Sequence, residues 1–191
     1  MDLPTTKMTY KLPDILSPDE VQRIIKSAKN IKHKALLMLI YGAGLRKSEA
    51  LNLQVKDIDR NRMMLHIRNT KNRKDRFVTL PKKVLEILEN YWRAYRFTHY
   101  LFPGRDLKKP LNGISASNIF ISAKKKADVK KDGGIHSLRH AFATHLLEAG
   151  TDLFTIKTLL GHTCIHSTIR YLAFVPERQK NYQSPVDRLD I

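Results

Sequence analysis

The hydrophobic pattern of this 191-residue chain changes period once, between residues 55 and 80, and this change constrains the fold more than any other feature. Residues 64–67 and 77–80 alternate in the manner of two short strands, and a polar segment with the turn-forming residues Asn69 and Asn72 joins them. On both sides of this region apolar residues recur at helical spacing. We therefore expect an α+β fold that is mostly helical, with a small antiparallel sheet or β-hairpin on one edge.

Helix start and stop signals divide the rest of the chain. Ser17, Pro18 and Glu20 stand in the order of an N-cap, a first helical position and the acidic residue of a capping box, which predicts a helix from this point. We expect Trp92 to fill the core and Ser115 to cap a helix. Further helices are expected at residues 33–41, 46–53, 82–95, 115–127, 136–149 and 152–160.

The charge of the chain points to a polyanionic partner. It has 35 Lys and Arg against 18 Asp and Glu, a formal net charge of +17, which is far more than solubility requires. A nucleic acid is the first candidate. The alternative is an ordinary basic protein with a solvated surface.

Length and apolar content indicate one globular domain with a substantial core. The longest apolar run, residues 35–41, is too short to cross a bilayer, and the N-terminus lacks the apolar segment of a signal peptide. The single cysteine, Cys164, excludes an intrachain disulfide and suits a reducing compartment. We expect a cytoplasmic protein without membrane contact.

Five polar residues could together transfer a phosphoryl group to a tyrosine. The guanidiniums of Arg46 and Arg139 can hold both non-bridging oxygens of a phosphodiester, the imidazoles of His136 and His162 can bind it or move a proton, and the phenol of Tyr171 can attack phosphorus. His136 and Arg139 are three residues apart and would share one face of a helix. This chemistry requires no metal and no cofactor.

Simpler interpretations exist for the same residues. His136 and His140 have the spacing of a helical zinc pair, but no carboxylate or cysteine stands at metal spacing beside them, so we expect no metal site. Taken alone, Tyr171 would be an anchor for the last helix. His140, His145 and His166 are expected to be structural, although His140 could support the site from behind.

Four segments resemble the signature boxes of the tyrosine recombinases, or phage integrase family, and the Xer-like members most of all. They are GAGLRKSEALNL at residues 42–53, HSLRHAFATHLL at 136–147, LLGH at 159–162 and TIRY at 168–171. Four boxes in the family's order are a far stronger signal than one short motif. The resemblance covers the chain from about Ser17 onward. The segment Leu172-Ala-Phe174 departs from the Thr-His-Val often found in the family.

The resemblance implies a site-specific recombinase or integrase that cuts and rejoins duplex DNA through a 3′-phosphotyrosyl intermediate. Tyr171 would be the nucleophile, while Arg46 and Arg139 would stabilise the charge developing at phosphorus. His162 would bind the phosphate, and His136 would help to handle the tyrosine proton, because a phenol of pKa about 10 is a poor nucleophile at neutral pH.

The family also carries a catalytic lysine on a hairpin, and Lys71 matches its place, with Lys74 as the rival. Lys71 would protonate the leaving 5′-oxygen. Contacts with the DNA backbone are expected from the basic residues of the hairpin and of the helix before His136, although a solvated charged surface is the alternative. The expected DNA contacts are Arg73, Lys74, Arg76, Lys124, Lys125 and Lys126.

The expected organisation has three parts. Residues 1–16 resemble a linker, residues 17–175 form the catalytic domain, and residues 176–191 form a tail that could dock on a neighbouring protomer or be disordered. Family members assemble as tetramers on double-stranded DNA and usually carry a second, helical N-terminal domain of about 100 residues. Only the linker precedes the catalytic domain in this sequence.

Two rival functions share most of these features. A type IB topoisomerase uses similar chemistry to relax supercoils without exchanging partners, but the Xer-like boxes count against it. The other rival is a DNA-binding accessory or regulatory module that retains the recombinase fold. The intact set of polar residues argues against that module, whereas the lack of a second helical domain in this sequence argues for it.

Overall fold

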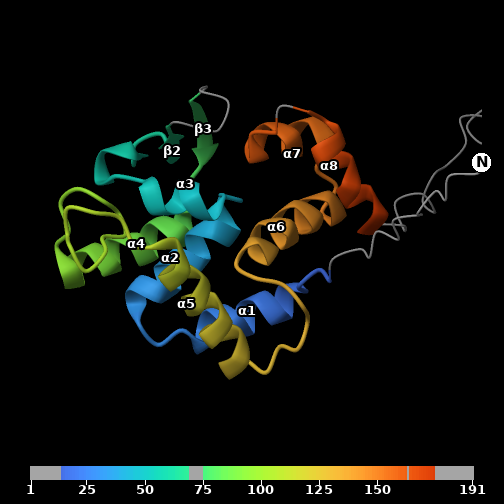
Figure 1. Ribbon diagram of the computed structural model, residues 1–191. Helices are drawn as coiled ribbons and strands as arrows, with labels where there is room; N and C mark the ends of the chain where they lie inside the picture. Colours follow the sequence, from blue (N-terminus) through green and yellow to red (C-terminus); the bar gives the residue numbers. More distant parts are fainter. Residues whose placement is uncertain (1–13, 69–74, 163, 175–191) are drawn as a thin grey trace, which may run out of the picture.

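The computed structural model describes residues 14–68, 75–162 and 164–174 (Figure 1). It confirms a mostly helical α+β fold with a small antiparallel sheet. Within the described ranges no helix is long and apolar enough to cross a membrane. The elements in chain order are α1 (Pro18–Ser27), α2 (Ile31–Gly42), α3 (Lys47–Asn52), η1 (Val55–Asp57), β1 (Ile58–Asp59), β2 (Met64–Ile67), β3 (Arg76–Thr79), α4 (Lys82–Tyr95), α5 (Gly113–Lys126), α6 (His136–Glu148), α7 (Leu153–Leu160), α8 (His166–Ile169) and η2 (Arg170–Phe174).

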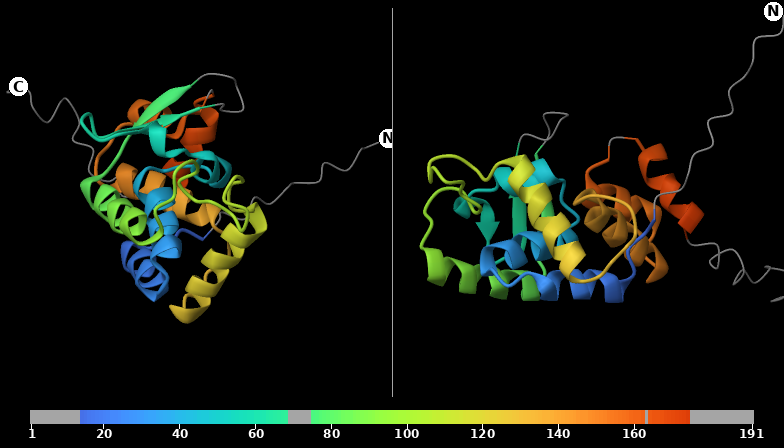
Figure 2. Two further views of the ribbon diagram at one scale, coloured as in Figure 1. Left: turned by 90° about the vertical axis from the view of Figure 1, so that its left-hand side faces the viewer. Right: turned by 60° about the horizontal axis from the view of Figure 1, so that its bottom comes forward.

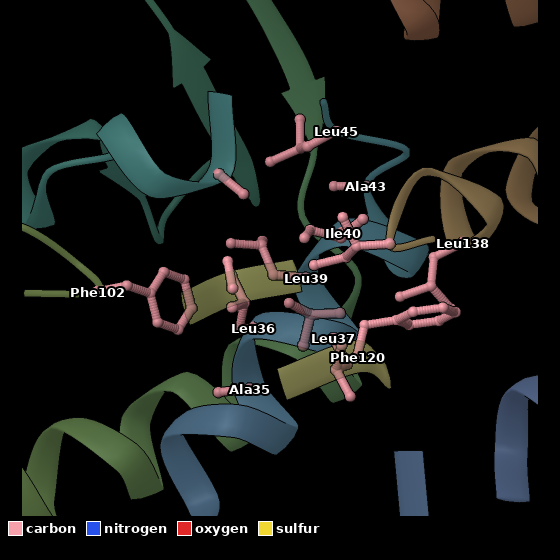
Figure 3. Packing of buried hydrophobic residues seen from close by; sticks show 14 of the residues in the cluster. Ala35, Leu36, Leu37, Leu39, Ile40, Ala43, Leu45, Phe102, Phe120 and Leu138 are labelled. Carbon is pink, nitrogen blue, oxygen red and sulfur yellow. The ribbon is translucent and has the colours of Figure 1, made fainter. Parts of the chain in front are cut away.

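Helix α2 lies at the centre of the molecule because it is apolar on every side after its first turn. Leu36, Leu37 and Leu39 point in different directions around the helix, yet all are fully buried. Such a helix must be surrounded, and α2 packs against α1, α3, α4 and α6. Figure 3 shows Phe102 and Phe120 from other segments beside these leucines. Each leucine buried in this way contributes about 1.5–3 kcal/mol to stability.

The sheet has the strand order β1-β2-β3, and both pairings are antiparallel. Leu65 of β2 pairs with Val78 of β3, and both are buried, whereas Phe77 on the other face is exposed. Strand β3, the second strand of the expected hairpin, spans Arg76–Thr79 instead of residues 77–80. Strand β1 was not expected, because two residues are too short to show a period.

The expectation that Trp92 fills the core is wrong. Tyr91 takes the core position of α4 and is fully buried, whereas Trp92 is 41% exposed. Successive residues of a helix are about 100° apart, so only one of the two rings can face inward. The indole nitrogen of Trp92 donates to the carbonyl of Phe97 at 3.1 Å, and the guanidinium of Arg96 lies 4.5 Å from its ring centroid.

The N-cap of α5 also differs from expectation. Asn112, rather than Ser115, precedes the helix, and its side-chain oxygen accepts a hydrogen bond from the backbone nitrogen of Ile114 at 2.7 Å. Asparagine and serine are similarly good caps, so the position of the first helical residue decides between them. The helix begins at Gly113, which places Ser115 inside its first turn.

Helices α6 and α7, together with η2, form a second small core beside the main one. It contains Ala143, Leu147, Ile156, Leu160 and Tyr171. Figure 1 and the right-hand view of Figure 2 show these helices on one side of the molecule, with the sheet and α4 on the other and α3 between them. A functional site at the N-termini of α3 and α6 would therefore lie where the two halves meet.

The packed part of the chain includes the end of the segment expected to be a linker. Leu16 is buried, and its carbonyl oxygen lies 2.9 Å from Nε2 of His145 on α6. Residues 1–13 and the expected tail at residues 176–191 lie outside the described ranges.

Candidate active site

All five side chains singled out by their chemistry line one cavity of about 230 Å³, although four separate segments supply them. Arg46 is the N-cap residue of α3, and His136 and Arg139 lie in the first turn of α6. His162 follows α7, and Tyr171 lies in η2. The remaining lining residues are His140, Ser167 and Arg170.

Two glycines shape the backbone around this cavity. Gly44 has φ +61°, a Cβ there would clash with the ring of Phe142, and its carbonyl accepts a hydrogen bond from Arg139. Gly161 has φ +62° and ends α7, and a Cβ there would lie 2.7 Å from the guanidinium nitrogen Nε of Arg76. Left-handed backbone without a side chain therefore allows the close approach of Phe142 to Gly44 and of Arg76 to Gly161.

Glu49 is the acidic centre of the site, and it was not among the residues expected there from the sequence. Its carboxylate accepts two hydrogen bonds from Arg76 at 2.8 and 2.9 Å and one from Arg46 Nη1 at 2.7 Å, and it lies 3.6 Å from Arg139 Nη1. It also accepts from the backbone nitrogen of Arg46 at 2.8 Å, closing the first turn of α3. That capping position, three residues after Arg46, was the available sequence signal.

Neighbouring arginines keep the carboxyl group of Glu49 ionised. Burial raises the pKa of this carboxyl, but the hydrogen bonds and charges of Arg76 and Arg46 outweigh burial and hold the pKa at about 2. The folded-state pKa is thus below the unfolded one. Its contribution to stability is present above the unfolded value of about 4.5 and is lost as the pH falls toward 2.

We expect the substitution Glu49→Gln to lower the free energy of unfolding at pH 7 by roughly 3 kcal/mol, because a neutral amide cannot balance the buried guanidiniums. The difference from the unsubstituted chain should shrink as the pH falls from 5 to near 2.5. Denaturant titrations across this pH range measure it. Glu86→Gln, at an exposed site on α4, is the matched control and should have little effect at any pH. A deficit independent of pH would contradict the electrostatic role.

The two arginines of the predicted clamp differ in exposure. Arg139 is 6% exposed at its side chain, and donates to the carbonyls of Gly44 and Leu160, each at 2.7 Å. Burial and the charge of Arg46 lower the pKa of Arg139 to about 10, which leaves it charged at neutral pH. Arg46 is 33% exposed and so stays more accessible to a ligand.

The hydrogen bonds of His162 define its tautomer. Arg139 can only donate, so Nε2 of His162 accepts from its Nη2 at 3.1 Å. The hydrogen therefore lies on Nδ1 and is donated to the hydroxyl of Thr168, which is fully buried, at 2.9 Å. Burial and the charges of Arg139 and Arg46 lower the pKa of His162 to about 4, so the ring is neutral at pH 7.

Tyr171 is buried at the cavity, with 2% of its surface exposed. Its hydroxyl lies 3.1 Å from Nδ1 of His140, not beside His136, which had been expected to handle the tyrosine proton. Burial raises the pKa of Tyr171, and the charges of Arg139 and Arg170 offset part of the increase. The hydroxyl is therefore protonated at neutral pH and needs a base before it can attack.

His136 lines the cavity and is partly exposed to solvent. Partial burial and the charge of Lys47 lower the pKa of His136, and Arg139 and Arg46 add to this effect. The ring is neutral at pH 7 and can donate a hydrogen bond to a ligand that enters from solvent.

The expected DNA-contacting residues are spread over other parts of the structure. Lys71, Arg73 and Lys74 lie outside the described residues. The guanidinium of Arg76 is paired with Glu49, and its side chain is 12% exposed. Lys124, Lys125 and Lys126 form the last turn of α5 and are not part of the cavity lining; Nζ of Lys124 donates to the carbonyl of Lys131.

Among the described residues, no group of three His, Cys, Asp or Glu side chains is arranged to hold a metal ion. The cavity instead gathers guanidiniums, from Arg46, Arg139 and Arg170, with Arg76 behind them. One carboxylate, Glu49, opposes these four positive charges. Such an excess of positive charge suits an anionic ligand, such as a phosphate, that guanidiniums bind with bidentate hydrogen bonds.

Comparison with known proteins gives one consistent result. The sequence model of the phage integrase family matches residues 14–178. A putative integrase/recombinase, y4eF of Sinorhizobium fredii, is 42% identical over 98% of this chain and 74% of its own length. Tyrosine recombinase XerA of Pyrococcus horikoshii is 36% identical over 88% of this chain, which spans 60% of that relative.

Solved structures agree with the sequence matches. The crystal structure of XerA recombinase superposes with a TM-score of 0.81 at 26% identity, covering 95% of this chain and 68% of the other. The XerH site-specific recombinase, in a post-cleavage complex with its palindromic difH substrate, gives 0.79 at 25% identity and covers 89% of this chain and 52% of the other. The chain thus spans about half to three quarters of the length of these relatives.

Proposed function

This chain belongs to the phage integrase family, and from that premise we propose that it is a site-specific recombinase that cuts and rejoins duplex DNA through a 3′-phosphotyrosyl intermediate. One observation carries the proposal. The hydroxyl-bearing side chain of Tyr171 and the guanidiniums of Arg46 and Arg139 line the same cavity. A nucleophile and two phosphate-binding groups are therefore within reach of one phosphodiester.

The phosphate would enter between the arginines and take over some of their present hydrogen bonds. Arg139 now gives one N–H to His162, and this contact is the one most readily exchanged, because the other partners of Arg139 are backbone carbonyls. His162 could then donate from Nε2 to the phosphate if the hydroxyl of Thr168 rotates and donates to Nδ1 instead. Donors held in place in this way stabilise the charge that develops at phosphorus.

The reaction would proceed by attack of the Tyr171 oxygen on phosphorus and departure of the 5′-oxygen of the next nucleotide. The phosphotyrosyl bond conserves the energy of the broken diester, so a 5′-hydroxyl from a partner strand can rejoin it without a nucleotide cofactor. We propose Lys71, with Lys74 as the rival, as the donor of a proton to the leaving oxygen. The other proposed contacts to the DNA backbone are Arg73, Lys74, Arg76, Lys124, Lys125 and Lys126.

Assembly on DNA is also part of the proposal. XerH is described in complex with its difH substrate, and a λ integrase fragment as a dimer bound to a core site. For this chain we propose double-stranded DNA as the partner and a tetrameric synapse as the active assembly. Residues 176–191 would form the contact between neighbouring protomers.

The proposed function is tested by trapping the intermediate. Duplexes of random sequence, each with a 5′-bridging phosphorothioate at one position, are incubated with the chain, and adducts are isolated under denaturing conditions. Sulfur is a good leaving group, so trapping does not depend on a lysine. We expect DNA to stay attached through its 3′ end to the peptide that contains Tyr171, as peptide mapping would show.

Other results would redirect the assignment. DNA binding without any adduct would support an accessory module. An adduct with relaxation of plasmid supercoils, but no exchange between two duplexes, would support a topoisomerase. An adduct on Tyr182 would show that Tyr171 is not the nucleophile.

A further inference from the structure

The hydroxyl of Tyr171 has a base beside it, His140, which was expected from the sequence to be structural. Nδ1 of His140 lies 3.1 Å from that hydroxyl, and the two rings are tilted by 50° with centroids 5.9 Å apart. His140 follows Arg139 on α6, and its side chain lines the same cavity. The histidine therefore contacts the reacting oxygen directly and faces the space where a phosphate would bind.

A second histidine–tyrosine pair, between His145 of α6 and Tyr41 of α2, shows what a structural contact of this kind looks like. Nδ1 of His145 lies 2.9 Å from the hydroxyl of Tyr41, and its Nε2 donates to the carbonyl of Leu16 at 2.9 Å. The backbone acceptor places the hydrogen on Nε2, so Nδ1 accepts from Tyr41. This pair does not line the cavity. Both pairs use Nδ1, but only that of His140 faces arginines that could hold a substrate.

We propose that His140 accepts the proton of Tyr171 during attack on phosphorus, and so acts as the general base in place of His136. This inference rests on the recombinase function proposed above. The O–H bond of Tyr171 breaks as its oxygen bonds to phosphorus, and the proton passes to Nδ1 of His140. The bond from phosphorus to the 5′-oxygen breaks with its electron pair, and the hairpin lysine protonates that oxygen. In the rejoining step the imidazolium returns the proton to the tyrosine.

The charges around His140 make its proton affinity depend on whether DNA is bound. Burial lowers the pKa of His140, and Arg170 of η2, with His136 and Arg139 of α6, lowers it further. The ring is thus neutral at pH 7 and can accept a proton. A bound phosphodiester adds a negative charge beside Arg139 and Arg170, which offsets their effect and favours the imidazolium. Proton transfer would then be most favourable when DNA is in place.

The test measures single-turnover adduct formation at saturating DNA on a trapping duplex recovered from the random pool. His140→Asn keeps a hydrogen-bonding group near the position of Nδ1 but cannot hold the proton. We expect it to slow adduct formation by about 10²-fold, within the usual range for a general base. DNA binding, followed by fluorescence anisotropy, should change less than about twofold. His145→Asn makes the same change in the other pair and should keep the rate.

Chemical rescue separates a base from a positioning group. His140→Ala should be as slow as His140→Asn, and added imidazole should restore part of its rate, with a pH dependence that follows the added base. A rate for His140→Asn equal to or above that of the unsubstituted chain would overturn the inference and leave the recombinase function standing. Failure of imidazole to restore His140→Ala would also overturn it. Absence of adduct with the unsubstituted chain would overturn the proposed function and this inference with it.

Discussion

Replacing Tyr171 with phenylalanine is expected to abolish the covalent DNA adduct. The substitution removes one oxygen atom, the only atom of this side chain that can bond to phosphorus. Loss of a nucleophile typically reduces the chemical step by roughly 10⁴-fold or more, which is below detection in a trapping assay. The ring stays in the core formed with α6 and α7, so stability should fall only by the hydrogen bond to His140, about 1 kcal/mol.

The matched control for this prediction is Tyr41→Phe. Tyr41 also loses a hydroxyl that contacts a histidine of α6, but it does not line the cavity. Denaturing gels with the trapping duplex measure adducts, and urea titrations measure stability for both variants. Tyr41→Phe should lose about as much stability and keep full adduct formation. Equal adduct formation by Tyr171→Phe would show that another residue attacks the DNA.

Replacing Arg46 or Arg139 with alanine should affect adduct formation similarly but stability differently. Arg46→Ala and Arg139→Ala are both expected to slow adduct formation by roughly 10³-fold or more, because each removes a charged donor to the phosphate in the transition state. Arg139→Ala should also destabilise the fold by about 3–5 kcal/mol, and Arg46→Ala should do so by less, because Arg46 is 33% exposed. Arg139→Ala leaves the carbonyls of Gly44 and Leu160 without their hydrogen-bond donor. It also removes a positive charge close to buried Glu49.

This prediction is checked by thermal or urea unfolding and by trapping on the same samples. Arg60→Ala is a suitable control, since Arg60 is 72% exposed and its ion pair with Glu89 lies on the surface. We expect it to alter stability by less than about 0.5 kcal/mol and to leave trapping unchanged. If Arg46→Ala were as destabilising as Arg139→Ala, the difference in exposure between the two arginines would have no energetic meaning.

Most of the fold could be predicted because its signals are local. The capping box at Ser17 and the apolar periods of α4, α6 and α7 define helices from neighbouring residues, and the change of period defines β2 and β3. The errors also have local causes. Strand β1 is too short for a period, Asn112 and Ser115 are equally good caps, and a one-residue phase decides whether Tyr91 or Trp92 faces the core.

The sequence by itself determined the family, the helical framework and the five polar side chains that meet at the cavity, because spacing and residue type are properties of the chain. Only the tertiary structure decided what those side chains touch. Glu49 meets Arg76 across 27 residues, His140 meets Tyr171 across 31, and Gly44 meets Arg139 across 95. Contacts over such separations depend on how helices and strands pack against one another. No local pattern contains that packing, and so the contacts of Glu49 with the arginines and of His140 with Tyr171 could not be predicted before the elements were placed in space.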